Sequence, residues 1–300
     1  MAHRDLILTT LHRVQYEYVA PFILSLERTG FSGDVAVFAS ALDNGCISEL
    51  QRQGAIVMPF KFRGKRTRQE WARLWPLWRW FFATGAAAPT KERLAHGVFH
   101  LCYRRHLLYL EFLRRHGADY DRVMLADARD VFFQMDPFSW NPTAGVHFVL
   151  EDGTRLGHCQ LHRRWLTCQF GKAFADRHAE AIASCAGTTF GSAGGIGAYL
   201  EQMVALTMQA RNLAKTYGGD QGIHNCVLIE KRVSPITVHP NRHGPVLTMG
   251  VMRPSDVRMN SEGAVLNDNG DVVPVLHQYQ HIPGLKEHLW ARLLQRTSVS

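Results

Sequence analysis

Two aspartates with an arginine between them, Asp127, Arg129 and Asp130, follow directly on a short apolar run at residues 123–126. A continuous apolar run of this length is typical of a strand buried on both faces, as in a parallel sheet. Open α/β sheets bind their ligands at the carboxyl ends of such strands. Carboxylates there need a cation or hydrogen bonds to offset their desolvation. The pattern therefore fits either a divalent-metal site or a pair of surface-loop aspartates.

The spacing of the two aspartates limits how they can act together. In a regular strand, residues three apart point to opposite sides of the sheet. Asp127 and Asp130 can therefore reach one ion only if the chain bends at Ala128 and Arg129. Arg129 could alternatively offset part of the charge of an anionic ligand.

Arg105 lies on the apolar stripe of a helix that the sequence predicts at residues 99–115. It falls four residues after Leu101 and three before Leu108, which belong to that stripe. An arginine inside an apolar stripe needs an anionic partner, unless its head reaches solvent at the helix edge. The two aspartates or a bound phosphate would supply such a partner.

The elements that must position these residues alternate along the first 60 residues. Strands are predicted at residues 5–10, 35–38 and 55–60, with helices between them at residues 19–28 and 48–53. This alternation indicates an α/β fold with a Rossmann-like, mostly parallel sheet flanked by helices. No GxGxxG motif follows the first strand, so the usual dinucleotide fingerprint is absent.

The later part of the chain continues the pattern less regularly. Asp220 follows two glycines and is expected to cap the helix after it. A glycine-rich segment at residues 185–197 would let backbone N–H groups approach a ligand closely. Strands are predicted at residues 146–150, 233–238, 246–249 and 272–276, and helices at residues 174–184 and 285–294.

The composition excludes several classes of protein but does not identify a reaction. Hydrophobic residues make up 46% of the 300 residues and charged residues 20%, which is ordinary for a globular protein. The net charge of +8 suits an anionic ligand such as a nucleoside diphosphate, a nucleic acid, an acidic glycan or an anionic membrane surface. The six cysteines show no CxxC spacing, which argues against a zinc site or a disulfide framework and favours a cytoplasmic protein. No signal peptide fits before the first strand, and no apolar run approaches the ~20 residues of a membrane span.

Two further segments have competing interpretations. Residues 61–82 interleave lysines and arginines with tryptophans and phenylalanines. They fit a surface that binds nucleic acid or a membrane, or an amphipathic helix that packs its tryptophans on the core and solvates its arginines. His158 and His162 are four residues apart with no carboxylate ligand spaced to match, so polar surface histidines are expected rather than a zinc site.

Several motifs, taken in order, resemble the nucleotide-sugar glycosyltransferases of the A-type fold, in a branch distantly similar to glycogenin-like transferases. The resemblance covers residues 5–285, and the usual Asp-x-Asp is replaced here by two aspartates three positions apart. It rests on the acidic segment Asp127-Ala128-Arg129-Asp130-Val131 followed by Asp136-Pro137-Phe138, on the glycine-rich residues 185–199, on Asp220-Gln221-Gly222-Ile223-His224-Asn225, and on Leu276-His277-Gln278-Tyr279.

The resemblance implies one domain over residues 1–300, with a nucleotide-binding half at residues 1–138 and an acceptor- and sugar-binding half at residues 139–300. It implies transfer of a sugar from a nucleotide-sugar donor to a glycan, lipid-linked or protein acceptor, with Mn²⁺ or Mg²⁺ as cofactor. The implied roles are metal binding by Asp127, Asp130 and His277, donor binding by Thr9, Thr10, Arg104, Arg105, Asp127, Arg129, Gly187 and Thr188, and catalysis by Asp220 and Gln221.

The sequence leaves one alternative for the stereochemistry of the reaction and one for the class of function. The Asp220-Gln221 pair resembles the arrangement of retaining transferases. An inverting reaction would instead need a carboxylate base, for which Glu151 and Asp152 are the candidates. The alternative function is a non-catalytic protein that binds nucleic acid or an anionic membrane through residues 61–82. The ordered motifs favour a transferase and disfavour nucleic acid as a partner, leave peripheral membrane contact open, and do not indicate an oligomeric state.

Overall fold

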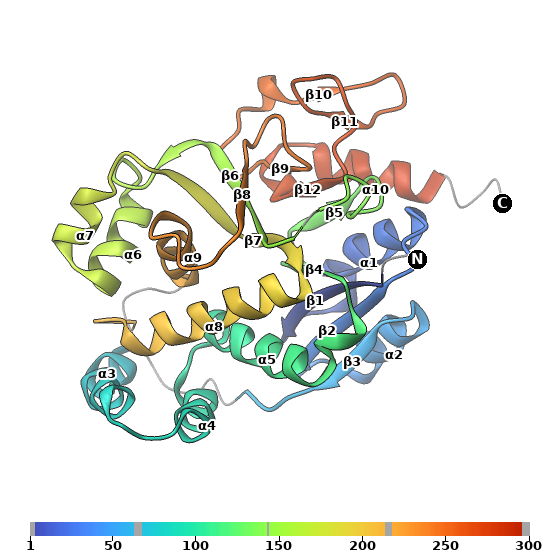
Figure 1. Cartoon of the computed structure of the whole chain (residues 1–300). Helices are drawn as coiled ribbons and strands as arrows, with labels where there is room; N and C mark the ends of the chain where they lie inside the picture. Colours follow the sequence, from blue (N-terminus) through green and yellow to red (C-terminus); the bar gives the residue numbers. More distant parts are fainter. Residues whose placement is uncertain (1–3, 63–67, 143, 214–217, 296–300) are drawn as a thin grey trace.

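A seven-stranded sheet forms the centre of the molecule, and helices cover both of its faces (Figure 1). The computed structural model describes residues 4–62, 68–142, 144–213 and 218–295. From one edge to the other, the strands are β3 (Ile56–Pro59), β2 (Asp34–Ser40), β1 (Asp5–His12), β4 (Arg122–Ala126), β7 (Ile182–Ser192), β6 (Val146–Arg155) and β8 (Ile236–His239). All run in one direction except β7, which is antiparallel to both neighbours. The prediction of a mostly parallel α/β sheet is confirmed.

The alternation of side chains along β1 explains how the two faces are filled. Leu6 and Leu8 belong to the apolar cluster on one face, and Ile7 belongs to the cluster on the other. The first face is covered by α3 (Arg68–Ala83), α4 (Ala88–Val98), α5 (Leu101–His116), α8 (Ala193–Gln209) and α9 (Asp220–Ile229). The second face is covered by α1 (Ala20–Arg28) and α2 (Asn44–Arg52).

A second, smaller sheet lies beside the central one, and two of its three strands come from the late part of the chain (Figure 1). It consists of β5 (Val131–Phe133), β12 (Val275–His277) and β9 (Val246–Thr248), with β12 in the middle. Its apolar side packs on α10 (Leu285–Gln295). The other elements are α6 (Gln160–Phe170), α7 (Lys172–Arg177), β10 (Arg258–Met259), β11 (Val265–Leu266) and short 3-10 helices at Tyr16–Tyr18, Gly117–Asp119, Pro254–Asp256 and Tyr279–His281.

The strand order creates a crevice at one end of the sheet. The chain leaves β1 toward β2 and β3 on one side, and later returns to place β4 on the other side of β1. At such a switch point the connections diverge, so the carboxyl ends of the two strands are left open for a ligand. Thr10 lies near the end of β1, and Asp127 follows directly on β4.

The structure corrects three of the predicted elements. The predicted helix at residues 174–184 is the shorter α7, and its last residues belong instead to β7. The first part of the glycine-rich segment is likewise a strand that was not predicted, because residues up to Ser192 form β7 between β4 and β6. The second helix begins at Asn44 rather than residue 48, with the carboxylate of Asp43 accepting a hydrogen bond from the backbone N–H of Cys46 at 2.7 Å.

The basic and aromatic segment at residues 61–82 is only partly described, because residues 63–67 and the side chains of residues 68–73 lie outside the described part. Within α3, Trp75 is buried and its indole N–H donates to the carbonyl of Ala210 at 3.0 Å, as expected for an amphipathic helix. Leu77 and Trp80 are instead 54% and 68% exposed. Over the described residues, no helix has the length and apolar character that crossing a bilayer requires.

Candidate active site

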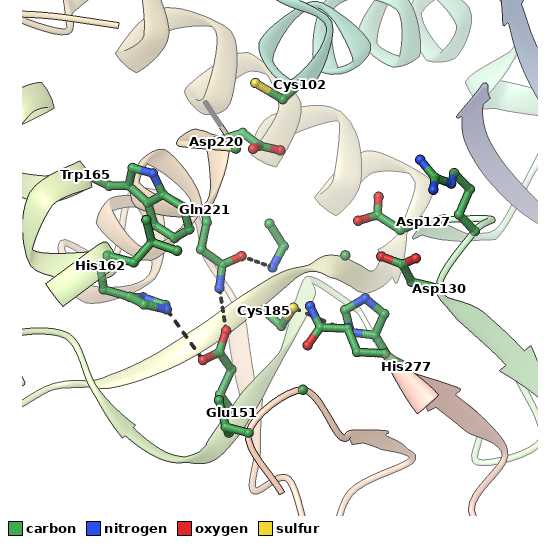
Figure 2. Close-up of a pocket in the computed structure, with 18 of the residues that line it drawn as sticks. Cys102, Asp127, Asp130, Glu151, His162, Trp165, Cys185, Asp220, Gln221 and His277 are labelled. Atoms are coloured by element: carbon green, nitrogen blue, oxygen red, sulfur yellow. Dashed lines mark hydrogen bonds and ion pairs between the residues drawn. The ribbon is translucent and has the colours of Figure 1, made fainter. Parts of the chain in front are cut away.

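A pocket of about 630 Å³ opens at the carboxyl ends of β1 and β4 (Figure 2). Its volume lies in the range of small-molecule sites. Asp127, Asp130, Glu151 and Asp220 place four carboxyl groups in its wall, and His277 lies among them. The electrostatics of the pocket depend on which cation or hydrogen-bond donor offsets the charge of each of these carboxyl groups.

The chain bends sharply after β4, as the spacing of the two aspartates requires. The backbone N–H of Asp130 donates to the carbonyl of Asp127 at 2.9 Å, which closes a tight turn. The hydroxyl of Thr9 accepts a hydrogen bond from the backbone N–H of Ala128 at 3.3 Å and so connects the turn to β1. The turn therefore brings two carboxylates onto one side, where a continuous strand would have separated them.

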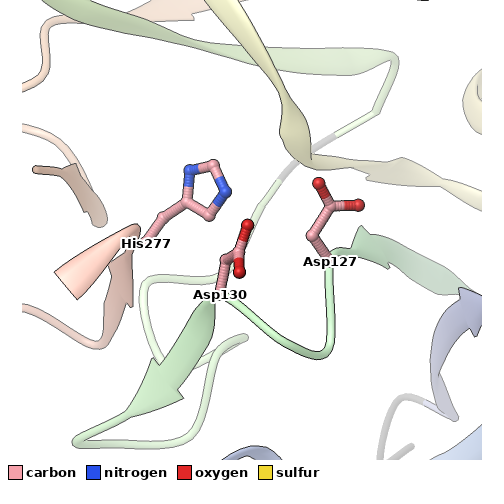
Figure 3. Close-up of side chains that lie close together, drawn as sticks. All are labelled: Asp127, Asp130 and His277. Atoms are coloured by element: carbon pink, nitrogen blue, oxygen red, sulfur yellow. The ribbon is translucent and has the colours of Figure 1, made fainter. Parts of the chain in front are cut away.

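His277 reaches the same place from the other end of the sequence. It is the last residue of β12 and lies opposite Val131 in the antiparallel pairing with β5. The backbone N–H of Gln278 also donates to the carbonyl of Asp130 at 2.7 Å. One ligand atom from each of Asp127, Asp130 and His277 lies within 4.8 Å of the others (Figure 3).

These three side chains fit a divalent cation. The buried Nε2 atom of His277 has no hydrogen-bond partner among the described residues. Burial lowers the pKa of His277, outweighing the carboxylates of Asp127 and Asp130, so the imidazole is neutral and can act as a ligand. A Cβ atom at Gly187 would lie 2.6 Å from Cε1 of His277 and 3.0 Å from Oδ2 of Asp127, so a side chain there would crowd the cluster. Two carboxylates and an imidazole suit Mn²⁺ and also admit Mg²⁺.

Arg105 is the cation that pairs with Asp127 and with the remaining aspartate of the pocket, Asp220. Its Nη1 atom pairs with Asp127, and its Nη2 atom lies 2.7 Å from Oδ2 of Asp220. Burial disfavours the charged form, yet the two carboxylates raise the pKa of Arg105 well above its ordinary value. Burial raises the pKa of Asp220 to about 6, with Arg105 acting against the shift. The expected anionic partner of this arginine is therefore a pair of aspartates, and Asp220 serves this ion pair instead of capping α9.

Gln221 lies in the pocket wall, with its amide bound by other parts of the protein (Figure 2). Its Oε1 atom accepts a hydrogen bond from the backbone N–H of Ala186 at 2.7 Å. Its Nε2 atom donates to the carbonyl of Ser184 and to Oε1 of Glu151, each at 2.8 Å. Glu151 also lies in the wall, and burial raises its pKa to about 7.

The other residues predicted to bind the donor occupy different positions. Thr10 lines the pocket and donates a hydrogen bond to the hydroxyl of Tyr109 at 2.9 Å, and the exposed Arg129 lies at the rim. Arg104 is not in the pocket wall, and its guanidinium stacks 5.3 Å from the ring of Phe60. Thr9 lies beneath the acidic turn, and Thr188 is fully buried outside the pocket wall.

His162 and Trp165 of α6 form a wall that the sequence interpretation missed. His162 is only 6% exposed, so its prediction as a surface histidine is wrong, whereas His158 is exposed and contacts Glu180. Burial lowers the pKa of His162 to about 4. Its Nε2 atom lies 3.5 Å from Oε2 of Glu151. The three-to-four spacing of His162, Trp165 and Gln169, all buried, was the available signal of a buried helix face.

The fold is similar to that of the glycosyltransferase GlyE of Streptococcus pneumoniae TIGR4, whose crystal structure matches with a TM-score of 0.52 and 12% sequence identity. The match covers 98% of this chain and 61% of that chain, so this chain spans about three fifths of the length of GlyE. Neither the models of protein families nor the curated proteins compared with the chain gave a match. At this identity the likeness shows a shared, glycosyltransferase-like fold.

Proposed function

We propose that this protein is a glycosyltransferase that moves a sugar from a nucleoside diphosphate donor to a hydroxyl-bearing acceptor. The observation that carries the proposal is the cluster of Asp127, Asp130 and His277 at the carboxyl end of β4, inside a pocket of about 630 Å³. The pocket lies at the strand switch point, where α/β folds bind nucleotides. The fold shared with GlyE supports the same class of reaction.

The residues of the cluster would hold Mn²⁺ or Mg²⁺, which acts when bound as a Lewis acid toward the leaving diphosphate. Arg105 holds the carboxyl groups of Asp127 and Asp220 in place, because it pairs with both. Arg129, exposed at the rim, is suited to meet the diphosphate, and Thr10 the nucleoside. In this arrangement residues 1–138 supply most of the donor site, and residues 139–300 supply the sugar and acceptor side.

Calorimetry and thermal unfolding with common nucleoside diphosphates and nucleotide sugars, with and without Mn²⁺, test the proposal. A ligand at 100 times its dissociation constant should add about 2.7 kcal/mol to the free energy of unfolding. Asp130→Asn and His277→Ala should remove the Mn²⁺-dependent part of that gain. Asp136→Asn is the matched control, since it keeps the acceptor for the backbone N–H of Phe138. A protein that binds none of these nucleotides at millimolar concentration is not a transferase of this kind.

A second function is favoured by one observation, the exposure of Leu77 and Trp80 on α3. These side chains, with the exposed Arg79 between them, suit contact with an anionic membrane surface. Such contact is compatible with a transferase that acts on a lipid-linked acceptor. Membrane or nucleic-acid binding without any nucleotide binding would favour the non-catalytic alternative.

A further inference from the structure

The amide of Gln221 has no hydrogen available for a substrate. A glutamine side chain offers two N–H donors, and both are used here by the carbonyl of Ser184 and by Glu151. Its oxygen already accepts from the backbone N–H of Ala186. These three contacts tie α9 to β7 and to the carboxyl group of Glu151. Gln221 is therefore placed to orient Glu151, whereas the resemblance to retaining transferases implied a catalytic role for it.

Glu151 differs from the other carboxyl groups of the pocket in how its charge is balanced. Asp127 and Asp220 share Arg105, and Asp130 belongs to the candidate metal cluster. Glu151 has hydrogen bonds from Gln221 and Thr154, and no lysine or arginine of the described residues pairs with it. Its neighbour His162 does not supply a positive charge at neutral pH, since burial lowers the pKa of that histidine to about 4.

The surroundings of Glu151 match those of a proton acceptor. Its side chain is 10% exposed, and it lies in the wall of the pocket. Burial is the main cause that raises its pKa to about 7, so it exchanges a proton near neutral pH. Asp152, the other carboxylate considered for this role, is not in the pocket wall. It is held by Arg242 at 2.7 and 2.6 Å.

The position of Glu151 separates it from the candidate metal cluster. In Figure 2, Glu151 lies next to His162 and below Trp165, whereas Asp127 and Asp130 lie on the opposite side of the pocket. A donor whose diphosphate lies at the cluster would direct its anomeric carbon toward the middle of the pocket. A hydroxyl group entering along α6 would then approach that carbon from the side away from the diphosphate.

We propose that Glu151 removes the proton of the attacking hydroxyl group and that Gln221 is the positioning residue that orients it. This inference rests on the proposed transferase function. The hydroxyl oxygen forms a bond to the anomeric carbon, and its proton passes to the carboxylate of Glu151. The bond between that carbon and the diphosphate oxygen breaks, and its electron pair leaves with the diphosphate. Attack from the opposite side inverts the configuration at the anomeric carbon, and Glu151 then releases the proton to water.

Hydrolysis of the donor, with water in place of the acceptor, tests this role without knowledge of the acceptor. Proton NMR during the first turnovers should show a released sugar of inverted configuration. Glu151→Gln should lower the hydrolysis rate by about 10²- to 10⁴-fold, with the dissociation constant of the donor within about twofold of the native value. The native rate should rise with pH through about 7, following the pKa of Glu151, and this rise should be absent in the variant.

Gln221→Ala tests the positioning role separately. It should lower kcat, leave donor affinity unchanged and raise the midpoint of the pH profile, because the hydrogen bond from Gln221 lowers the pKa of Glu151. Gln221→Glu would place a second carboxyl against Glu151 and raise that midpoint as well. Asp152→Asn is the control on the same strand, and its rate and midpoint should match those of the native protein, since Arg242 keeps its contact with Asp256. Thermal unfolding of each variant checks that it is folded.

The possible failures are distinguishable. If no nucleotide sugar binds the native protein, the proposed transferase function fails, and this inference fails with it. If a donor binds, three results overturn the role of Glu151 alone: a Glu151→Gln variant within tenfold of the native rate, a product of retained configuration, or no hydrolysis of the bound donor at pH 8.

Discussion

Nη2 of Arg105 lies 2.7 Å from Oδ2 of Asp220, although the two residues are 115 positions apart in the chain. The contact joins α5 to the first residue of α9, and the side chain of Asp220 is 7% exposed. The same guanidinium also pairs with Asp127. One arginine thus pairs with two carboxylates that come from different parts of the fold, so its loss leaves neither of them with an ion-pair partner among the described residues.

Replacing Arg105 with methionine should therefore destabilise the protein strongly. A buried carboxylate that loses its ion-pair partner costs about 3–5 kcal/mol, and the partial exposure of Asp127 places the expected loss near the lower value. Urea unfolding measures the change in the free energy of unfolding. Arg115→Met, at an exposed position of the same helix, is the control and should change it by less than about 0.5 kcal/mol. Equal effects of the two substitutions would show that the Arg105 ion pairs do not contribute to stability.

Gly187→Ala should block the metal cluster without unfolding the protein. The added Cβ atom would overlap the imidazole of His277 and touch Oδ2 of Asp127, so these ligands could no longer approach one another. Titration with Mn²⁺, followed by calorimetry, should show binding at least about tenfold weaker than native, a difference of about 1.4 kcal/mol. Gly97→Ala is the matched control, because its Cβ atom would meet nothing within 4 Å. Native Mn²⁺ affinity in the Gly187 variant would contradict the site.

The free energy of unfolding of the Glu151→Gln variant, relative to the native protein, should be higher at alkaline pH than at acid pH. Burial raises the pKa of Glu151 in the folded state to about 7, above the ordinary value near 4.5 that holds in the unfolded chain. The folded state therefore binds more protons between these values, and its stability falls as the pH rises through them. The variant lacks this loss, so it should gain about 3 kcal/mol over the native protein between pH 4.5 and pH 8. Urea unfolding at both values measures it, and a pH-independent difference would contradict the shifted pKa.

The exposed apolar face of α3 should bind anionic membranes. The double substitution Leu77→Ser with Trp80→Ser removes two large apolar side chains that are 54% and 68% exposed. Because burial of one such side chain contributes about 1.5–3 kcal/mol, binding should weaken by at least about tenfold. Sedimentation with phosphatidylcholine vesicles, with and without phosphatidylserine, measures this. Met259→Ser, an exposed apolar residue on β10, serves as control. Failure of the native protein to sediment with either vesicle would exclude this surface as a membrane contact.

The sheet was predictable in its first half because the signals there are local. The buried runs of β1, β2 and β4 are continuous, and Gly30 ends the helix after β1. β7 escaped prediction because the stretch from Ala183 to Ala186 contains small residues without strand preference. It is a strand because β4 and β6 pair with it on either side, and such long-range pairing leaves no local mark.

The candidate site was predictable where order along the chain sufficed. The acidic turn and His277 were found from motifs, and the bend at Ala128 and Arg129 follows from the spacing of the aspartates. The role of Gln221 could not be found in this way, because its partners Ser184 and Ala186 lie on β7, a strand that was not predicted. His162 was assigned to the surface because only its spacing to His158 was weighed, whereas its spacing to Trp165 and Gln169 indicated a buried helix face.

The third member of the candidate metal cluster, His277, lies on β12 near the late end of the chain, whereas the acidic turn lies near its middle. During synthesis, the two aspartates therefore leave the ribosome long before His277 does. A nascent or proteolytically shortened chain that lacks β12 still contains every strand of the central sheet. Such a chain would carry only two of the three side chains of the candidate cluster, so truncated products of this protein should bind a divalent cation more weakly than the full chain.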